Sequence, residues 1–181
     1  IAAGSLRARF RLANWGSQIA VQADSDWKPV PVLLPAVNAD AEAFNSGQIL
    51  DTDQHLGDGT DDILTRLSLY NRVEHLSFGR LYKVPEEADS YLRRLRNVVS
   101  DLAGYDLILY HSGADTHVDD PLGGVLTTKQ MMMRDRMVFE AARTGGVPLA
   151  WCLSGGYQKP LSKVVDLHLN TMKECIAAYS S

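Results

Sequence analysis

The stretch Ile49-Leu50-Asp51-Thr52-Asp53-Gln54-His55 passes from apolar residues into alternating acidic and imidazole side chains. Residues 48–53 predict a strand, and side chains two apart on an extended chain point the same way. Asp53 and His55 can therefore share one cation. The Asp-x-Asp-x-His pattern alone also fits a strand end with solvated polar groups. The glycines of Gly57-Asp58-Gly59-Thr60 favour a binding site, because they let a backbone wrap closely around it.

Three more apolar runs predict strands over residues 73–78, 106–111 and 147–153. The last two lack clean alternation, so we expect them to be buried on both faces. Helices are predicted between and after the strands, over residues 61–70, 86–102, 128–143 and 161–178. This order predicts one α/β domain over residues 1–181, with a mostly parallel sheet flanked by helices on both faces.

The first 46 residues are less regular. We expect a helix over residues 6–12, a strand over 18–22 and another helix over 36–44. Residues 24–35 contain three prolines and are typical of an extended loop. The N-terminal residue, Ile1, is an unusual natural start, which indicates that residues precede it.

Ligands of a parallel sheet bind beyond the carboxyl ends of its strands. Asp115 follows the third predicted strand, so it can join Asp53 and His55. Two carboxylates and one imidazole suit zinc, iron or cobalt better than calcium. Three protein ligands leave positions for water and substrate, which is the catalytic pattern.

Composition excludes several classes of function. The net charge of −4 and the scattered basic residues do not indicate direct nucleic-acid binding. Apolar runs are all shorter than the roughly 20 residues of a membrane span. The two cysteines indicate a reduced, cytoplasmic protein, and Cys152 is expected to be a small core residue.

Three segments resemble the histone deacetylase superfamily in order and spacing: Ile49–Thr60, Gly113–Gly124 and Leu153–Tyr157. The similarity covers residues 48–178 and is greatest to bacterial histone deacetylase-like amidohydrolases, a group that includes acetylpolyamine amidohydrolases. Residues 1–46 match poorly. The resemblance implies the arginase/deacetylase fold, truncated on the N-terminal side.

The resemblance also implies roles for single residues. Asp53, His55 and Asp115 would ligate Zn²⁺, with Fe²⁺ or Co²⁺ as alternatives. Tyr157 would donate a hydrogen bond to the scissile amide oxygen, and Gly155 and Gly156 would let it move and let substrate approach. A structural K⁺ would bind at the side chain or carbonyl oxygens of Asp51, Asp53, His55, Ser77 and Phe78.

The family's adjacent pair of catalytic histidines is missing, because residues 1–54 contain no histidine. Asn14-Trp15-Gly16-Ser17-Gln18 stands in that region, and Leu56 replaces a second histidine beside His55. Three explanations stay open. The chain is a piece of a longer enzyme, a diverged metal-binding protein, or an enzyme with another base, such as Asp26, Asp119 or a group of a second subunit.

The remaining histidines have mostly structural interpretations. His75 is expected to be hydrogen-bonded within a strand, and His111 to lie near the rim of the sheet. His117 is expected near the site or on the surface, and His168 in a helix. Trp151, in the last strand, is expected in the core.

The sequence thus predicts zinc-dependent hydrolysis of an N-acetylated amine, such as an acetyl-lysine peptide or a small acetylpolyamine. Asp119 and Asp120 suit a cationic substrate. The alternative is a catalytically impaired relative that binds metal or acyl ligand. Arginase-type binuclear chemistry is disfavoured, since Asp115-Thr116-His117 lacks a second Asp-x-Asp pair. Homo-oligomers fit either function.

Overall fold

A four-stranded parallel sheet organises the part of the chain that the computed structural model describes, residues 11–12, 28–29 and 46–180. All neighbouring strands pair in parallel, in the order β4-β3-β5-β6. The strands are β3 (Gly47–Asp51), β4 (Val73–Ser77), β5 (Leu107–Gly113) and β6 (Leu149–Ser154). The predicted α/β class is confirmed.

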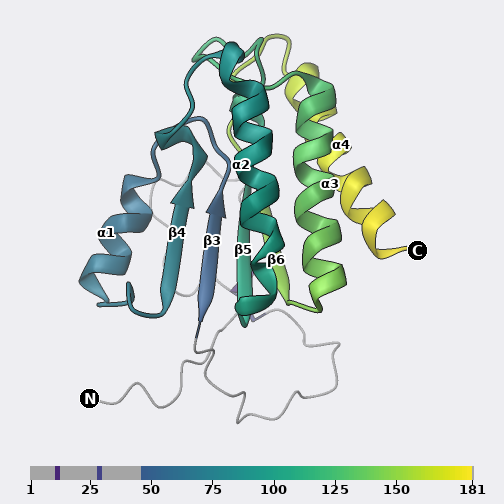
Figure 1. The fold of residues 1–181 in the computed structure, drawn as a ribbon. Helices are drawn as coiled ribbons and strands as arrows, with labels where there is room; N and C mark the ends of the chain where they lie inside the picture. The colour runs from purple at the N-terminus through teal and green to yellow at the C-terminus, as the bar shows by residue number, and fades with distance from the viewer. Residues whose placement is uncertain (1–10, 13–27, 30–45, 181) are drawn as a thin grey trace. The chain divides into compact units, whose positions relative to one another are not determined.

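Four helices connect and flank these strands (Figure 1). Figure 1 shows α2 and α3 in front of the sheet, α4 beside α3, and α1 next to β4. Their bounds are α1 (Asp58–Arg66), α2 (Ala88–Ser100), α3 (Thr128–Gly145) and α4 (Ser162–Tyr179). The first helix starts and ends earlier than predicted, and Ser68 beyond it has a positive φ of 54°.

The ends of α3 follow from its sequence. Thr127 caps its start, because the Thr127 hydroxyl accepts a hydrogen bond from the Gln130 amide while the Gln130 side chain returns to the Thr127 amide. Gly146 ends it in the left-handed conformation at φ 66°, which glycine adopts readily. This helix carries the buried Arg134.

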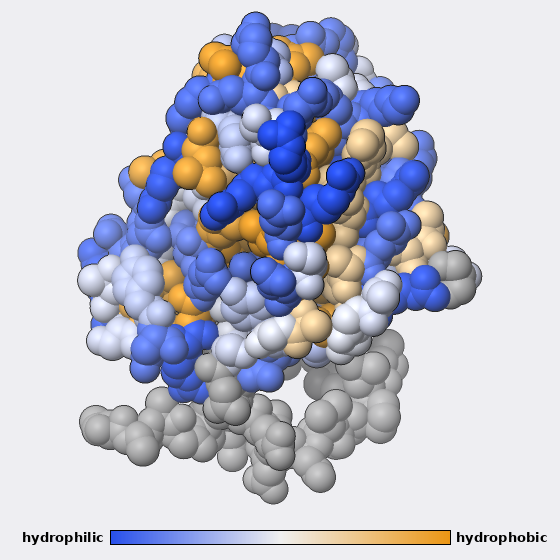
Figure 2. Space-filling model, viewed as in Figure 1, coloured by the Kyte–Doolittle hydropathy of each residue, from blue (hydrophilic) through white to orange (hydrophobic). Residues whose placement is uncertain are grey.

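The main core lies between the sheet and helices α2, α3 and α4. Leu50 and Tyr110 point from the sheet toward Leu95 of α2 and Phe139 of α3, and all four are almost fully buried. Trp151, expected in the core, is only partly buried and packs against it, edge-on to Phe139. Figure 2 shows the outer side of α2 covered mainly by hydrophilic residues, as one-sided packing predicts.

The other face of the sheet is only partly covered within residues 46–180. Helix α1 covers β4 there, since Asp61 contacts His75 of that strand. Beyond it, Ile49, Leu109 and Cys152 line an open hollow of about 400 Å³. The expectation that β5 and β6 are buried on both faces is therefore wrong, and so is a core position for Cys152, which is exposed. Hydrogen bonding to neighbouring strands does not bury the face of a strand; only a second layer packed on that face does.

A separate unit spans Ile1–Phe44, and little of it is described. Within it, β1 (Arg11–Leu12) pairs antiparallel with β2 (Lys28–Pro29). The predicted helix over residues 6–12 is wrong at Arg11 and Leu12, which are extended. The strand expected over 18–22 and the helix over 36–44 lie outside the described residues. Of the helices in the described part, none has the length and apolarity to cross a membrane.

Candidate metal centre

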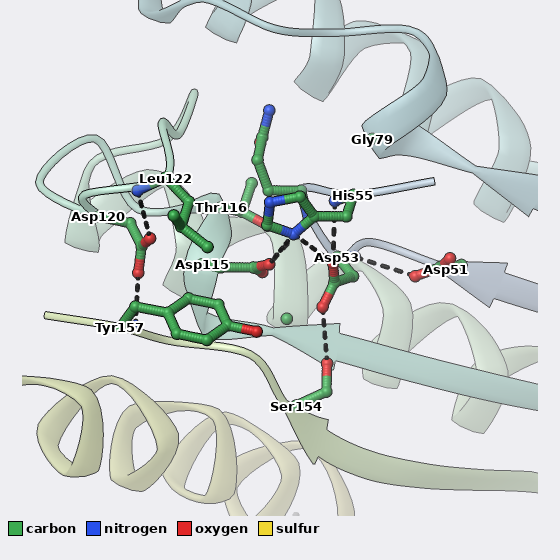
Figure 3. Close-up of polar contacts among 12 residues, drawn as sticks. Asp51, Asp53, His55, Gly79, Asp115, Thr116, Asp120, Leu122, Ser154 and Tyr157 are labelled. Carbon is green, nitrogen blue, oxygen red and sulfur yellow. Dashed lines mark hydrogen bonds and ion pairs between the residues drawn. The ribbon is translucent and has the colours of Figure 1, made fainter. Parts of the chain in front are cut away.

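Three potential metal ligands meet where β3 and β5 end (Figure 3). Asp53 and His55 come from the β3 loop, which we define as residues 52–56, and Asp115 from the β5 loop, residues 113–116. One ligand atom of each lies within 4.8 Å of the other two. The His55 Nδ1 atom is 2.8 Å from Asp115 Oδ2 and 3.3 Å from Asp53 Oδ1. Parallel pairing of β3 with β5 brings the two loops to one edge of the sheet.

Asp115 is the buried member of the group, with a side chain that is 0% exposed. A Cβ added at Gly155 would lie 2.6 Å from Asp115 Cγ, and one at Gly113 would lie 2.7 Å from Asp115 Oδ1. Only glycine at these two positions leaves room for the carboxylate. Burial and the neighbouring Asp53 carboxylate raise the pKa of Asp115 to about 6. Such a pair of close carboxylates creates a place that favours a cation.

The β3 loop is more open, since the His55 side chain is 48% exposed and that of Asp53 15%. Asp53 is nevertheless held on both sides. Its Oδ1 accepts a hydrogen bond from the His55 amide at 2.9 Å, and its Oδ2 accepts one from the Ser154 hydroxyl at 3.2 Å. The Gln54 amide donates to Asp115 Oδ1 at 3.2 Å, which ties the two loops together.

Tyr157 faces this group from the loop after β6 (Figure 3). Its ring is edge-on to that of His55, with ring centroids 6.4 Å apart, and its side chain stays accessible. The Tyr157 amide donates to Asp120 Oδ2 at 2.8 Å, while Asp120 Oδ1 accepts from the Leu122 amide at 3.0 Å. The buried Asp120 thus fixes the backbone from which the phenol projects.

The glycines before Tyr157 are required by the loop that carries it. Gly155 and Gly156 have φ angles of 59° and 100°, which side-chain-bearing residues rarely adopt. A Cβ on Gly156 would also lie 2.5 Å from Val164 of α4. The loop is therefore held tightly at its base, and the structure records close packing at these positions.

Three of the groups expected to hold potassium lie close together: Asp51, Ser77 and the His55 carbonyl. Asp51 pairs in register with Ser77, and the Ser77 hydroxyl donates weakly to the His55 carbonyl at 3.5 Å. A Cβ on Gly79 would lie 2.5 Å from the His55 carbonyl oxygen, so the turn after β4 and the β3 loop approach closely here. The buried Phe78 directly precedes that glycine.

Two histidines contact the Asp51 carboxylate on the partly open face of the sheet. Asp51 Oδ1 is 2.9 Å from His111 Nδ1, and Asp51 Oδ2 is 3.6 Å from His75 Nε2. Burial alone would raise the pKa of Asp51, but the hydrogen-bonded His111, the nearby His75 imidazole and the Asp53 amide lower it to about 2. The expectation that His75 is hydrogen-bonded is confirmed by its 2.7 Å contact with Asp61.

Known proteins share sequence with this chain. Residues 81–172, about half of the chain, match the histone deacetylase domain family. The chain belongs to this family. It is also 32% identical over 136 residues to an uncharacterized protein of Picosynechococcus sp. (strain ATCC 27264 / PCC 7002 / PR-6). That alignment covers 66% of this chain and 45% of the relative, so the chain spans less than half of the relative's length.

The histone deacetylase match includes Asp115 and Tyr157 but starts after Asp53 and His55. In the structure, Asp53 and His55 nevertheless lie next to Asp115, because the β3 loop packs against the β5 loop. His117, two residues after Asp115, is buried and contacts the Thr128 hydroxyl at 2.9 Å. His168 lies half-buried on α4.

Sequence reasoning missed three residues that hold this centre in place: Asp120 as an anchor for Tyr157, Ser154 as a partner of Asp53, and the buried Arg134. Asp120 and Ser154 lie in the quoted motifs, so their place at the rim was visible and only their partners were not. Arg134 lies in a helix next to Asp135 and gave no signal of burial. The spacing of residues along the sequence does not indicate these three hydrogen-bonding roles.

Proposed function

We propose that this chain carries the metal-binding part of a zinc-dependent deacetylase that hydrolyses an N-acetylated amine. The observation that carries the proposal is the convergence of Asp53, His55 and Asp115 opposite the Tyr157 phenol. Family membership supports a deacetylase-type hydrolase. Fe²⁺ and Co²⁺ are alternatives to Zn²⁺, since the same donor set suits all three.

The three side chains fit a divalent metal in chemistry and spacing. Donors about 2 Å from a tetrahedral zinc ion lie roughly 3.3 Å apart. The His55 nitrogen lies 2.8 and 3.3 Å from the two carboxylate oxygens, close to that separation. A bound cation would also offset the repulsion between the Asp53 and Asp115 carboxylates.

Each group of the chain would have a defined task in amide hydrolysis. A metal at these ligands would polarise the amide carbonyl and make water more acidic. The Tyr157 phenol would donate a hydrogen bond to the carbonyl oxygen, and this bond strengthens as negative charge develops there. Asp120 would fix the position of the phenol relative to the metal ligands by accepting a hydrogen bond from the Tyr157 amide.

Proton transfer needs a base that the family takes from its histidine pair. Asp26, one alternative base, lies outside the described residues. Asp119 is described, and its side chain is 67% exposed. Asp26, Asp119, a group of a second subunit and a preceding segment of a longer enzyme all stay alternatives for this role.

The proposed substrates are an acetyl-lysine peptide or a small acetylpolyamine. Asp119 and Asp120 differ in what they can offer such a cation. Asp120 already accepts hydrogen bonds from two backbone amides, so the exposed Asp119 is the better contact for a positive charge. Two free cysteines support a reducing compartment such as the cytoplasm as the place of action.

A structural K⁺ is part of the proposal. Its ligands would be oxygen atoms of Asp51, Asp53, His55, Ser77 and Phe78, where β4 packs against the β3 loop. An ion there would stiffen the backbone that presents Asp53 and His55.

The second candidate function is a module that binds metal or acyl ligand without turnover. The missing histidine pair favours it. Metal content and activity separate the two. We expect the purified chain to bind about one zinc ion and to release acetate from a fluorogenic acetyl-lysine peptide, with inhibition by a hydroxamate.

The deciding variant is Tyr157→Phe, which removes the phenol oxygen but no metal ligand. We expect unchanged zinc content and a loss of kcat by at least about 100-fold, the effect of removing one oxyanion donor. Tyr179→Phe is the matched control, because Tyr179 is similarly exposed and lies at the end of α4. Stoichiometric zinc without turnover in the unchanged chain would favour the binding module.

A further inference from the structure

An arginine lies beneath the candidate metal centre with no exposed surface. Arg134 of α3 is 0% exposed and is among the largest fully buried side chains of the described residues. Buried charges are expensive and are kept where they are paired and hydrogen-bonded. The partners of Arg134 therefore show what the residue is for.

The guanidinium reaches both sides of Asp115. Arg134 Nη1 donates to the Gly113 carbonyl at 2.9 Å and, more weakly, to the Thr116 hydroxyl at 3.5 Å. Gly113 and Thr116 are the first and last residues of the β5 loop. A single side chain thus holds the backbone before and the side chain after the candidate ligand.

The contact continues into the β3 loop through Thr116. The Thr116 hydroxyl donates to the Thr52 carbonyl at 2.6 Å, and Thr52 directly precedes Asp53. Thr52 and Thr116 are themselves fully buried. The two loops that carry the candidate ligands therefore share one hydrogen-bonded support, and Arg134 is its charged member.

Asp135 anchors Arg134 from the same helix. Its Oδ1 accepts from Arg134 Nε at 2.7 Å and from the Tyr110 hydroxyl, and its Oδ2 accepts from Thr171 of α4 at 2.6 Å. The Ser112 hydroxyl accepts from Arg134 Nη2 at 3.0 Å. The guanidinium is thus fixed by β5, α3 and α4 together, which leaves it little freedom to turn.

We propose that Arg134 is a positioning residue that sets the spacing of the two ligand loops. It holds Gly113 and Thr116 on either side of Asp115, and it reaches the backbone before Asp53 through Thr116. The inference rests on the proposed metal site. It adds to it a fixed, planar donor group whose geometry lysine cannot reproduce. Replacement of a buried ion pair by apolar residues often leaves stability unchanged, so stability alone does not explain the pair.

The first test changes Thr116, because its removal leaves the buried ion pair intact. Thr116→Val deletes the hydroxyl that links Arg134 to Thr52, and Thr116→Ser keeps it. We expect Thr116→Val to weaken Zn²⁺ and Co²⁺ affinity by about 10- to 100-fold, the range for residues that orient metal ligands. Thr116→Ser should retain nearly the affinity of the unchanged chain.

The second test changes Arg134 itself. Arg134→Lys keeps the positive charge but loses the planar guanidinium with its several donors. We therefore expect a loss of metal affinity similar to that of Thr116→Val. We also expect a changed visible absorption of the Co²⁺ form, which reports ligand geometry. Arg136→Lys is the control. Arg136 lies two positions after Arg134 on α3. Two of its guanidinium nitrogens donate to Glu174 of α4, at 2.7 and 3.1 Å, and these hydrogen bonds involve neither ligand loop.

Thermal unfolding of the metal-free variants separates positioning from general loss of structure. Equal metal affinity and equal Co²⁺ spectra for Thr116→Val and Thr116→Ser would overturn the inference, even if Arg134→Lys fails to fold. A metal loss in Arg136→Lys as large as in Arg134→Lys would also overturn it. Failure of the unchanged chain to bind either ion would overturn both the inference and the proposed function.

Discussion

The two loops that supply the candidate ligands differ in how they are supported. The β5 loop places a fully buried Asp115 between two glycines, above Arg134. The β3 loop leaves His55 about half exposed and holds Asp53 by its own backbone and Ser154. One ligand is thus fixed by the interior of the domain and two by the rim. We expect changes in the β5 loop to affect metal binding more than equivalent changes in the β3 loop.

The largest expected effect comes from Asp115→Asn compared with His55→Ala. Asp115→Asn should reduce metal affinity by more than about 100-fold, beyond the range for residues outside the ligand set. His55→Ala should cost less, because water can enter the exposed place and serve as a ligand. Isothermal titration with Zn²⁺ measures both. A larger loss of Zn²⁺ affinity in His55→Ala than in Asp115→Asn would show that the β3 loop matters more for metal binding than the β5 loop.

Asp115→Asn should also change the stability of the metal-free chain with pH. Asp115 has a raised pKa of about 6 in the folded state, against an ordinary value of 3.8. The native state therefore binds the proton more tightly, and stability falls as pH rises from about 4 through 6. The asparagine variant escapes this loss, so at pH 8 it should be more stable by about 2 kcal/mol, and equally stable near pH 4. Urea unfolding at both pH values checks the sign.

Gly155→Ala is expected to have the next largest effect. Its Cβ would lie 2.6 Å from Asp115 Cγ, at a φ of 59°. Gly146→Ala is a matched control, because Gly146 has a φ of 66° and no atom within 4 Å of an added Cβ. Both variants should lose about 1–2 kcal/mol of stability from backbone strain. Only Gly155→Ala should lose metal affinity, and equal affinities in the two variants would show that the carboxylate can shift freely.

Asp120→Asn tests the anchor of Tyr157 without touching the ligands. One carboxylate oxygen becomes an amide nitrogen, so one of the two backbone amides at Tyr157 and Leu122 loses its acceptor. We expect kcat to fall about 10-fold, the cost of one buried unsatisfied donor, with metal affinity unchanged. The exposed Asp119→Asn should leave kcat within about 2-fold unless Asp119 is the base, for which a loss of at least about 100-fold is expected.

Ser154→Ala should give the smallest effect. It removes the 3.2 Å hydrogen bond to Asp53 Oδ2, while the His55 amide still holds Oδ1. The expected loss in metal affinity is about 3- to 10-fold, which corresponds to one ordinary hydrogen bond. A loss as large as that of Asp115→Asn would mean that the rim, and not the interior, fixes the ligands.

The parallel sheet and its polar rim could be predicted from the sequence because their signals are local. Apolar runs gave the strands, and Asp53, His55 and Asp115 follow two of them directly. The exposure of Cys152 was missed, because a strand's own residues do not reveal whether a second layer covers it. Arg134 was missed for a similar reason. A charged residue in an amphipathic helix is usually solvated, and its burial depends on partners 18 to 22 positions away along the chain.

The thiol of Cys152 gives an experimental handle on the centre. It is an exposed cysteine on β6, in register with His111, whose imidazole contacts Asp51. Partial desolvation of the thiol and the nearby Asp51 charge raise the pKa of Cys152, so maleimide labelling should be slow at neutral pH and faster at about pH 9. Once attached, an environment-sensitive dye would lie in the hollow beside the β3 strand. Its emission could then follow ion loading in real time, with Cys175→Ser removing the competing thiol.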